Sequence, residues 1–164
     1  TDGIQDISLS FEQGEDDIMK RPPRDPKESL FDKELFKEII VSGFFIGILV
    51  FAFFYYLLKG LNMDLSIARG YVMALMVFIQ NTHVFNCRSE INSVFSKNIK
   101  RNDIVFLGVF GSILLEVIVM EVPLFAKYLQ TTSIPMLHLV YLMLISLSVI
   151  ALMEVYKKLR FRLK

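Results

Sequence analysis

Four stretches of this chain carry no charged residue, or a single one, and each is long enough to cross a bilayer. They are residues 39–58, 70–87, 104–120 and 134–153, and the one charge among them is Glu116. A helix needs roughly 20 mostly apolar residues to span the hydrocarbon core, with about 17 as the lower limit. Because 54% of the 164 residues are hydrophobic, little of the chain is left for a soluble domain. We therefore expect an all-α, polytopic transmembrane bundle that lies in a lipid bilayer, and no nucleic-acid partner.

The chain divides into three expected parts. Residues 1–12 have the pattern of the end of a helix, and residues 13–37, which hold three of the five prolines, are predicted to be a cytoplasmic loop. Residues 38–164 are predicted to form four full spans with their connecting loops and a basic tail. The last external loop is expected between Pro123 and Pro135. The opening residue, Thr1, suggests a piece of a longer polypeptide.

The basic residues predict how the spans are oriented. Of the 18 lysines and arginines, six lie in residues 20–37, four in 88–101 and five in 157–164. Basic loops stay on the cytoplasmic side of a membrane. We therefore expect these three segments, and the C-terminus, in the cytoplasm, with the plasma membrane as the location. The single cysteine, Cys87, permits no intrachain disulfide and is expected to be a reduced thiol.

Three polar residues near the N-terminus form the first candidate site. Gln5 and Asp6 follow Asp2 by three and four positions, which is expected to place all three on one helical face. Two carboxylates at this spacing repel each other unless a cation lies between them, and oxygen ligands suit such a cation. The alternative is a solvated helix end, where the acids cost little.

The second candidate site lies in residues 70–87. Gln80, His83 and Cys87 follow one helical stripe, and Asn81, Thr82 and Asn86 lie beside them. These side chains predict either hydrogen bonds between helices or part of an ion pathway. No second histidine or acid lies at ligand spacing from His83, so a hydrogen-bonded histidine is the favoured interpretation of that residue.

The remaining polar and small residues within the spans are interpreted as packing. A carboxylate exposed to lipid is costly, so Glu116 is expected either to face protein or to be protonated. Gly108 and Ser112 share its ridge, and small residues there favour close helix approach, as do Gly43 and Gly47. The same interpretation applies to His138, Ser146 and Ser148.

A loop motif resembles a known family. The run DDIMKRPPR at residues 16–24 is similar to the loop between the sixth and seventh membrane helices of class-two P-type cation ATPases, which include the sarcoplasmic-reticulum calcium pump and the sodium–potassium pump. Thr1-Asp2-Gly3 matches the Thr-Asp pair of the family's sixth helix, and Cys87-Arg88 with residues 92–95 resembles the loop after the eighth. Glu154, Val155 and Lys157 resemble the end of the tenth.

The resemblance implies that this chain is the end of helix six and helices seven to ten of an ATP-driven cation pump. It implies ion ligation by Asp2 and Thr1. Gln80 aligns with a glutamate of calcium pumps, and His83 with a sodium-site aspartate. ATP and Mg²⁺ would be bound by other domains of the parent, which with its other membrane helices would be the partners of this chain. Two departures are Gln5, where the family has proline, and Asp6, where it has a small residue.

Three functions therefore remain as hypotheses. Part of a calcium pump is favoured. A pump for a monovalent cation is the first alternative, since neutral oxygens such as that of Gln80 suit such ions. A stand-alone four-span accessory protein is the second. The sequence contains no Asp-Lys-Thr-Gly phosphorylation motif, so the chain alone is not expected to hydrolyse ATP.

Overall fold

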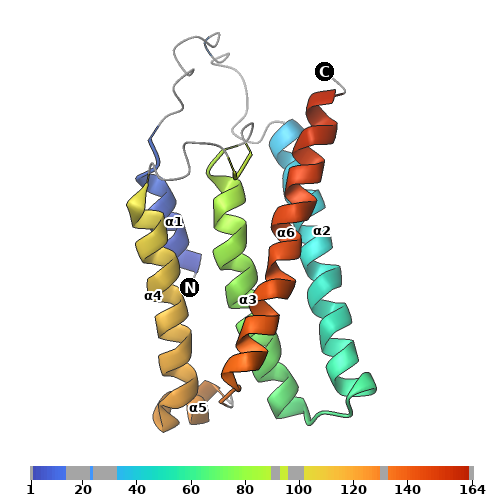
Figure 1. Cartoon of the computed structure of the whole chain (residues 1–164), viewed down its shortest axis with the longest axis vertical. Helices are drawn as coiled ribbons and strands as arrows, with labels where there is room; N and C mark the ends of the chain where they lie inside the picture. The colour runs from blue at the N-terminus through green and yellow to red at the C-terminus, as the bar shows by residue number, and fades with distance from the viewer. Residues whose placement is uncertain are drawn as a thin grey trace.

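The computed structural model of the chain is a bundle of roughly antiparallel helices (Figure 1). It describes residues 2–13, 23, 33–89, 93–95, 102–129 and 133–162, except for the side chains of residues 2, 34, 161 and 162. The regular elements are α1 (Asp2–Ser10), α2 (Lys33–Tyr55), the π-helix η2 (Tyr56–Gly60), α3 (Leu65–Cys87), α4 (Asp103–Glu121), α5 (Pro123–Leu129) and α6 (Met136–Arg162). Over these residues the prediction of an all-helical fold is confirmed.

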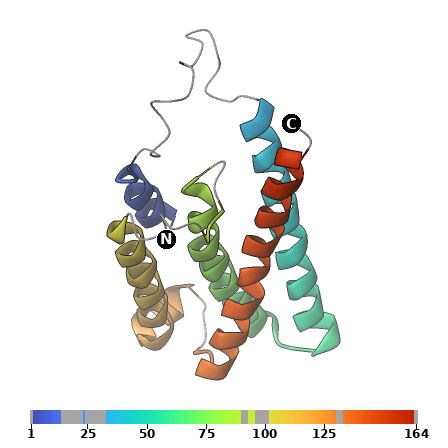
Figure 2. The same cartoon turned by 45° about the horizontal axis from the view of Figure 1, so that its top comes forward.

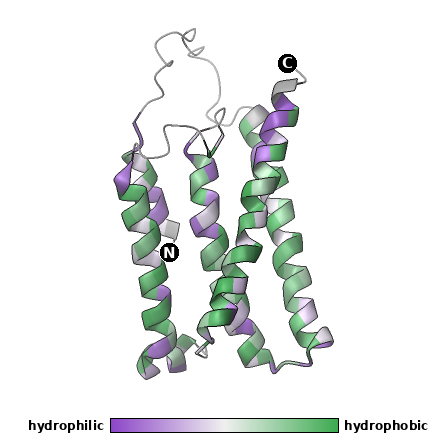
Figure 3. Cartoon of the chain, in the orientation of Figure 1, coloured by the Kyte–Doolittle hydropathy of each residue, from purple (hydrophilic) through white to green (hydrophobic). Residues whose placement is uncertain are grey.

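Three helical segments are long and apolar enough to cross a membrane: Leu35–Gly60, Asp103–Glu121 and Met136–Arg160. They correspond to three of the four expected spans. The 23-residue helix α3 has the required length, but its second half carries several polar side chains, visible as purple and pale ribbon in Figure 3. Its passage across the bilayer therefore stays a prediction.

The helix α3 lies at the centre of the bundle. It packs against α6 and α2 on one side and against α4 and α1 on the other (Figure 1, Figure 2). Its buried residues are mostly apolar in the first half, where Ala68, Ala74 and Leu75 are fully enclosed. Leu142, Val149 and Met153 of α6 belong to the same hydrophobic core. A helix with so much of its surface covered can carry polar groups that lipid would not tolerate.

Helical structure extends into two of the predicted connections. Residues 33–37 were expected in the loop, but α2 begins at Lys33, because no proline or glycine interrupts this charged segment and its residues are mostly good helix formers. Residues 123–129 were expected in an external loop, but they form α5. Pro123 begins that helix, where its missing N–H costs no hydrogen bond. Most of the predicted loop 13–32 lies outside the described residues.

The ends of the helices meet at two ends of the bundle. The first turn of α2, the last turn of α3, the first turn of α4 and the last turn of α6 lie at one end, together with the end of α1 (Figure 1). At the opposite end, Asn62 takes a left-handed backbone conformation, with φ of 48°, in the short connection from η2 to α3. Asparagine tolerates this conformation better than most residues. Successive long helices thus run in opposite directions, as the predicted topology requires.

Candidate functional site: the polar contact of α1, α3 and α4

A hydrogen-bonded cluster joins three helices in the interior of the bundle. Gln5 of α1 donates through Nε2 to Asn81 Oδ1 of α3 at 2.6 Å, and lies 3.4 Å from Ser112 Oγ of α4. The Ser112 hydroxyl donates to the same Asn81 oxygen at 2.6 Å. All three residues are buried. We call them the Gln5–Asn81–Ser112 cluster.

A second contact lies one turn further along α1. A Cβ added to Gly108 would come 2.3 Å from Ser8 Oγ and 3.3 Å from Ser8 Cβ, so α1 and α4 approach each other there as closely as a glycine allows. Ser8 is itself buried and donates its hydroxyl to the carbonyl oxygen of Ile4. The predicted role of Gly108 and Ser112 in helix packing is confirmed.

The other predicted small-residue contact is not made by the described residues. A Cβ added to Gly43 or Gly47 would meet no atom within 4 Å, because this face of α2 is turned outward and Phe44 is 71% exposed. The prediction that these glycines bring two helices together is therefore wrong for the residues that the structure describes.

Several buried polar atoms around the cluster have no hydrogen-bond partner among the described residues. They are Gln5 Oε1, Asn81 Nδ2, His83 Nδ1, Glu116 Oε1 and both side-chain polar atoms of Asn86. Buried polar groups are rarely left unpaired, because each costs about 1–3 kcal/mol. These atoms belong to α1, α3 and α4.

Glu116 also lines a cavity. The cavity holds about 650 Å³ between α2, α3 and α4, and its walls are mainly apolar, with Phe51, Met76 and Leu115 among them. The polar residues of its lining are Arg69, Gln80 and Glu116. Glu116 is 4% exposed, as expected for a carboxylate that faces protein. Its Oε1 has no hydrogen-bond partner among the described residues.

The structure separates the candidate ligands predicted from sequence. Thr1 and the side chain of Asp2 lie outside the described residues. Gln5 is buried in the cluster, whereas Asp6 is exposed, because consecutive helical residues point about 100° apart. Asp6 therefore does not share the surroundings of Gln5, as the predicted common face required.

Gln80 and His83 of α3 are half-buried. Gln80 lines the cavity, while His83 lies elsewhere on α3. Within the described residues, no three His, Cys, Asp or Glu side chains gather as a metal site would require. Cys87 is a free, exposed thiol at the end of α3.

The predicted packing role of the polar residues on α6 agrees with their contacts. Ser146 and Ser148 donate to carbonyl oxygens three residues earlier in their own helix. His138 Nδ1 lies 2.5 Å from the Tyr71 hydroxyl of α3. In addition, Thr82 of α3 donates to the Ser146 carbonyl at 3.2 Å. The contacts of Tyr71 with His138 and of Thr82 with Ser146 join α3 to α6.

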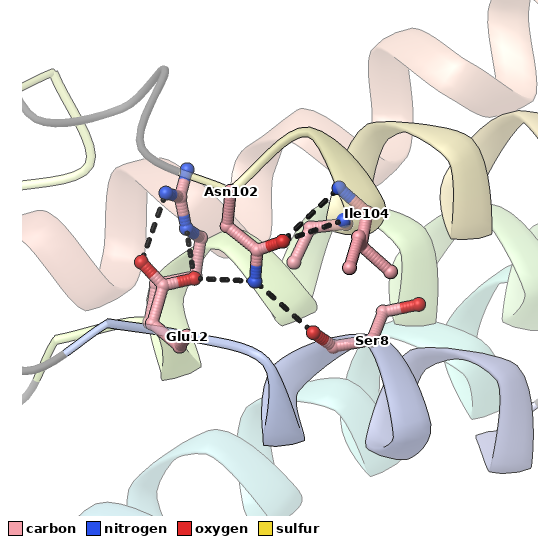
Figure 4. Close-up of polar contacts among 6 residues, drawn as sticks. Ser8, Glu12, Asn102 and Ile104 are labelled. Carbon is pink, nitrogen blue, oxygen red and sulfur yellow. Dashed lines mark hydrogen bonds and ion pairs between the residues drawn. The ribbon is translucent and has the colours of Figure 1, made fainter.

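Sequence reasoning missed a cluster at the end of α1. Arg88 donates to both carboxylate oxygens of Glu12, each at 3.0 Å. Asn102 donates to Glu12 Oε2 and to the Ser8 carbonyl, and its own Oδ1 accepts from the backbone N–H groups of Ile104 and Val105 (Figure 4). An asparagine directly before a helix is a capping signal, but its bonds to α1 leave no trace in the sequence.

Known proteins similar to this chain identify its family. Residues 1–159 match a family model described as "Cation transporting ATPase, C-terminus". The chain belongs to this family. It is therefore the C-terminal membrane region of a P-type cation ATPase.

Individual relatives agree with the family. The chain is 37% identical over 134 residues to a calcium-transporting ATPase of Bacillus subtilis (strain 168), which covers 82% of this chain and 15% of the relative. It is 30% identical over 159 residues to the calcium-transporting ATPase type 2C member 1 of Homo sapiens, and this alignment covers 96% of the chain and 17% of the relative. It is 28% identical over 158 residues to calcium-transporting ATPase 1 of Schizosaccharomyces pombe, and this alignment covers 95% of the chain and 17% of the relative. The chain thus spans less than a fifth of the length of these relatives.

Proposed function

We propose that this chain is the C-terminal membrane part of an ATP-driven calcium pump, in which it supplies scaffold and part of the ion-binding site. The observation that carries the proposal is the family match over residues 1–159, together with relatives that are named calcium-transporting ATPases from bacteria, fungi and animals. ATP and Mg²⁺ would be bound by other domains of the parent polypeptide, and the chain by itself would not hydrolyse ATP.

Asp2 is the proposed ion ligand of this chain, with Thr1 beside it. Two features support this assignment. Asp2 is the first residue of α1, and α1 is held by hydrogen bonds to α3 and α4, so that a ligand at its start has a fixed position. The nearby unpaired polar atoms, such as Gln5 Oε1 and Asn81 Nδ2, would find partners in the ion's remaining ligands or in bound water.

The other candidates have weaker support. Asp6 is exposed and is proposed only as a secondary ligand. Gln80 lines the cavity as a neutral group, and His83 contributes no carboxylate oxygen. Calcium prefers six to eight oxygen ligands, several of them carboxylates. A site poor in carboxylates near α3 therefore favours a pump that carries one calcium ion per cycle.

The experiment uses the full-length pump. Asp2→Asn is expected to abolish calcium-dependent phosphorylation by ATP while leaving expression and phosphorylation by inorganic phosphate intact. A variant that forms the normal amount of calcium-dependent phosphoenzyme would refute Asp2 as a ligand. If the unmodified pump needs sodium or potassium instead of calcium, the monovalent alternative holds.

The number of ions is measured separately, by equilibrium binding of labelled calcium to the unmodified pump. We expect one calcium ion per phosphorylation site. Two ions bound cooperatively would overturn the single-ion proposal without affecting the assignment of Asp2.

We also propose the orientation that the basic residues predict, with the end of the bundle that holds Cys87 and the first turn of α2 in the cytoplasm. Single cysteines at Asn62 and Ser93 in a Cys87→Ser background test it. An impermeant thiol reagent added outside intact cells should label position 62 and not position 93, and the reverse pattern would contradict the orientation.

A further inference from the structure

The end of α1 is fixed to two other helices by a compact set of charge-assisted hydrogen bonds. Glu12 receives two bonds from Arg88 and a third, at 3.0 Å, from Asn102 Nδ2. The labelled residues of Figure 4 show these groups converging from the end of α1 and the start of α4. We call Glu12, Arg88 and Asn102 the Glu12–Arg88–Asn102 cluster.

The cluster is shielded from solvent. The side chain of Arg88 is 7% exposed and that of Glu12 is 19% exposed, while Asn102 is buried. A paired arginine and carboxylate in this geometry fix both distance and angle, because two parallel N–H···O bonds form at once. Water competes less for this partly buried pair than for an exposed one, and removing one partner leaves the other charge poorly solvated.

Together with the contacts described above, the cluster fixes α1 at three successive levels. Gln5 is bound to Asn81 and Ser112, Ser8 abuts Gly108, and Glu12 is bound to Arg88 and Asn102. The helices α1 and α4 run in opposite directions, so residues later in α1 contact residues earlier in α4. Sliding or rotating α1 would break all three levels together.

A short helix transmits such a constraint along its length. The helix α1 covers nine residues, about 12 Å from its first residue to its last at 1.5 Å per residue. Calcium requires its oxygen ligands within about 2.3–2.6 Å. A shift of the Glu12 end by an ångström or more would therefore displace a ligand at the Asp2 end beyond the range in which it can coordinate.

We propose that the Glu12–Arg88–Asn102 cluster positions the ion site: it sets the depth and rotation of α1, and thereby of Asp2, relative to α3 and α4. This inference rests on the proposed function, since Asp2 is the ligand it positions. Glu12, Arg88 and Asn102 do not touch the ion in this scheme. They are positioning residues.

The test compares Glu12→Gln with Glu154→Gln in the full-length pump. Glu154 is a matched control because it is buried at the same end of the bundle and its Oε1 accepts from the backbone N–H of Val94 at 2.7 Å, but it bonds α6 to that segment rather than α1. Both substitutions remove one negative charge that is at least partly buried and nearly preserve the side-chain shape.

Glu12→Gln is expected to raise the calcium concentration for half-maximal phosphorylation by ATP about tenfold, because the neutral amide no longer pairs with Arg88. Phosphorylation by inorganic phosphate without calcium should be unchanged. For Glu154→Gln, the calcium concentration for half-maximal phosphorylation should stay within twofold of that of the unmodified pump. Arg88→Lys keeps the charge but loses the paired geometry, so it should give an intermediate shift of about threefold. It provides a second test of the cluster if the Glu12 variant does not fold.

The outcomes separate the two proposals. If the unmodified pump shows no calcium-dependent phosphoenzyme, the proposed function fails. If it does, but Glu12→Gln and Arg88→Lys keep the original calcium dependence, only the positioning role is overturned. An equal loss of phosphoenzyme from ATP and from inorganic phosphate, with no shift in calcium dependence, would likewise overturn it, because that pattern marks a purely structural contact.

Discussion

The two sides of α3 are held by different kinds of contact. On the α6 side, the interface is built mainly from buried apolar residues, with Leu75 of α3 and Leu142, Val149 and Met153 of α6 in one core. On the α1 and α4 side, it is built around Asn81, whose Oδ1 accepts hydrogen bonds from both Ser112 and Gln5. Hydrogen bonds of Tyr71, Thr82 and Lys157 also cross the α6 side. One helix thus carries a mainly apolar interface on one face and an interface centred on polar side chains on the other.

The two interfaces differ because lipid can solvate an apolar helix face but not a polar one. Lipid tails solvate an apolar helix face about as well as another helix does, so apolar packing in a membrane relies on close fit. A polar group has no such substitute in the hydrocarbon region, and its hydrogen bonds also depend on direction. The apolar side therefore contributes mainly stability, whereas the polar side fixes the position of α1.

The largest expected effect comes from widening the polar interface. Gly108→Leu places a side chain where Ser8 already lies, since even a Cβ would come within 2.3 Å of its hydroxyl. We expect α1 to be displaced and calcium-dependent phosphorylation of the full pump to be lost. The control is Gly111→Leu, whose Cβ would meet no atom within 4 Å. Equal activity of the two variants would contradict the difference between the interfaces.

The next effect in size concerns the apolar interface. Leu142→Ala leaves a cavity at a residue that is 2% exposed, and such truncations cost about 2–5 kcal/mol in packed cores. The temperature of half-inactivation should fall by several degrees, while the calcium concentration for half-maximal phosphorylation stays the same. Leu144→Ala on the exposed face of α6 is the control. A changed calcium dependence in Leu142→Ala would show that this side also positions the ion site.

The smallest effect is expected from a single hydroxyl. Ser112→Ala removes one of the two bonds to Asn81 Oδ1, while the bond from Gln5 remains. Hydrogen bonds between membrane helices contribute about 0.6 kcal/mol on average, so the calcium dependence should shift only about threefold. Ser146→Ala is matched, because that serine is fully buried but donates only within its own helix, to the Met143 carbonyl. Its calcium dependence should not move.

The prediction from sequence was most accurate where the signal is local. The uncharged stretches located α2, α4 and α6, and the spacing of Gly108, Ser112 and Glu116 identified the buried ridge of α4. Two segments predicted as connections from charge or proline, at Lys33 and Pro123, are helical, because both residue types are also tolerated in the first turn of a helix.

The sequence by itself determined that this chain is a membrane-type helical bundle and, through the motif at residues 16–24, which family it resembles. Hydrophobic length and motif spacing are properties of consecutive residues, so they need no folded structure to be recognised. Only the tertiary structure decided that Gln5 points inward and Asp6 outward, that Asn81 meets Ser112, and that Glu12 is bound by Arg88. These partners are 31 and 76 positions apart, and their pairing follows from how the helices pack rather than from any local pattern.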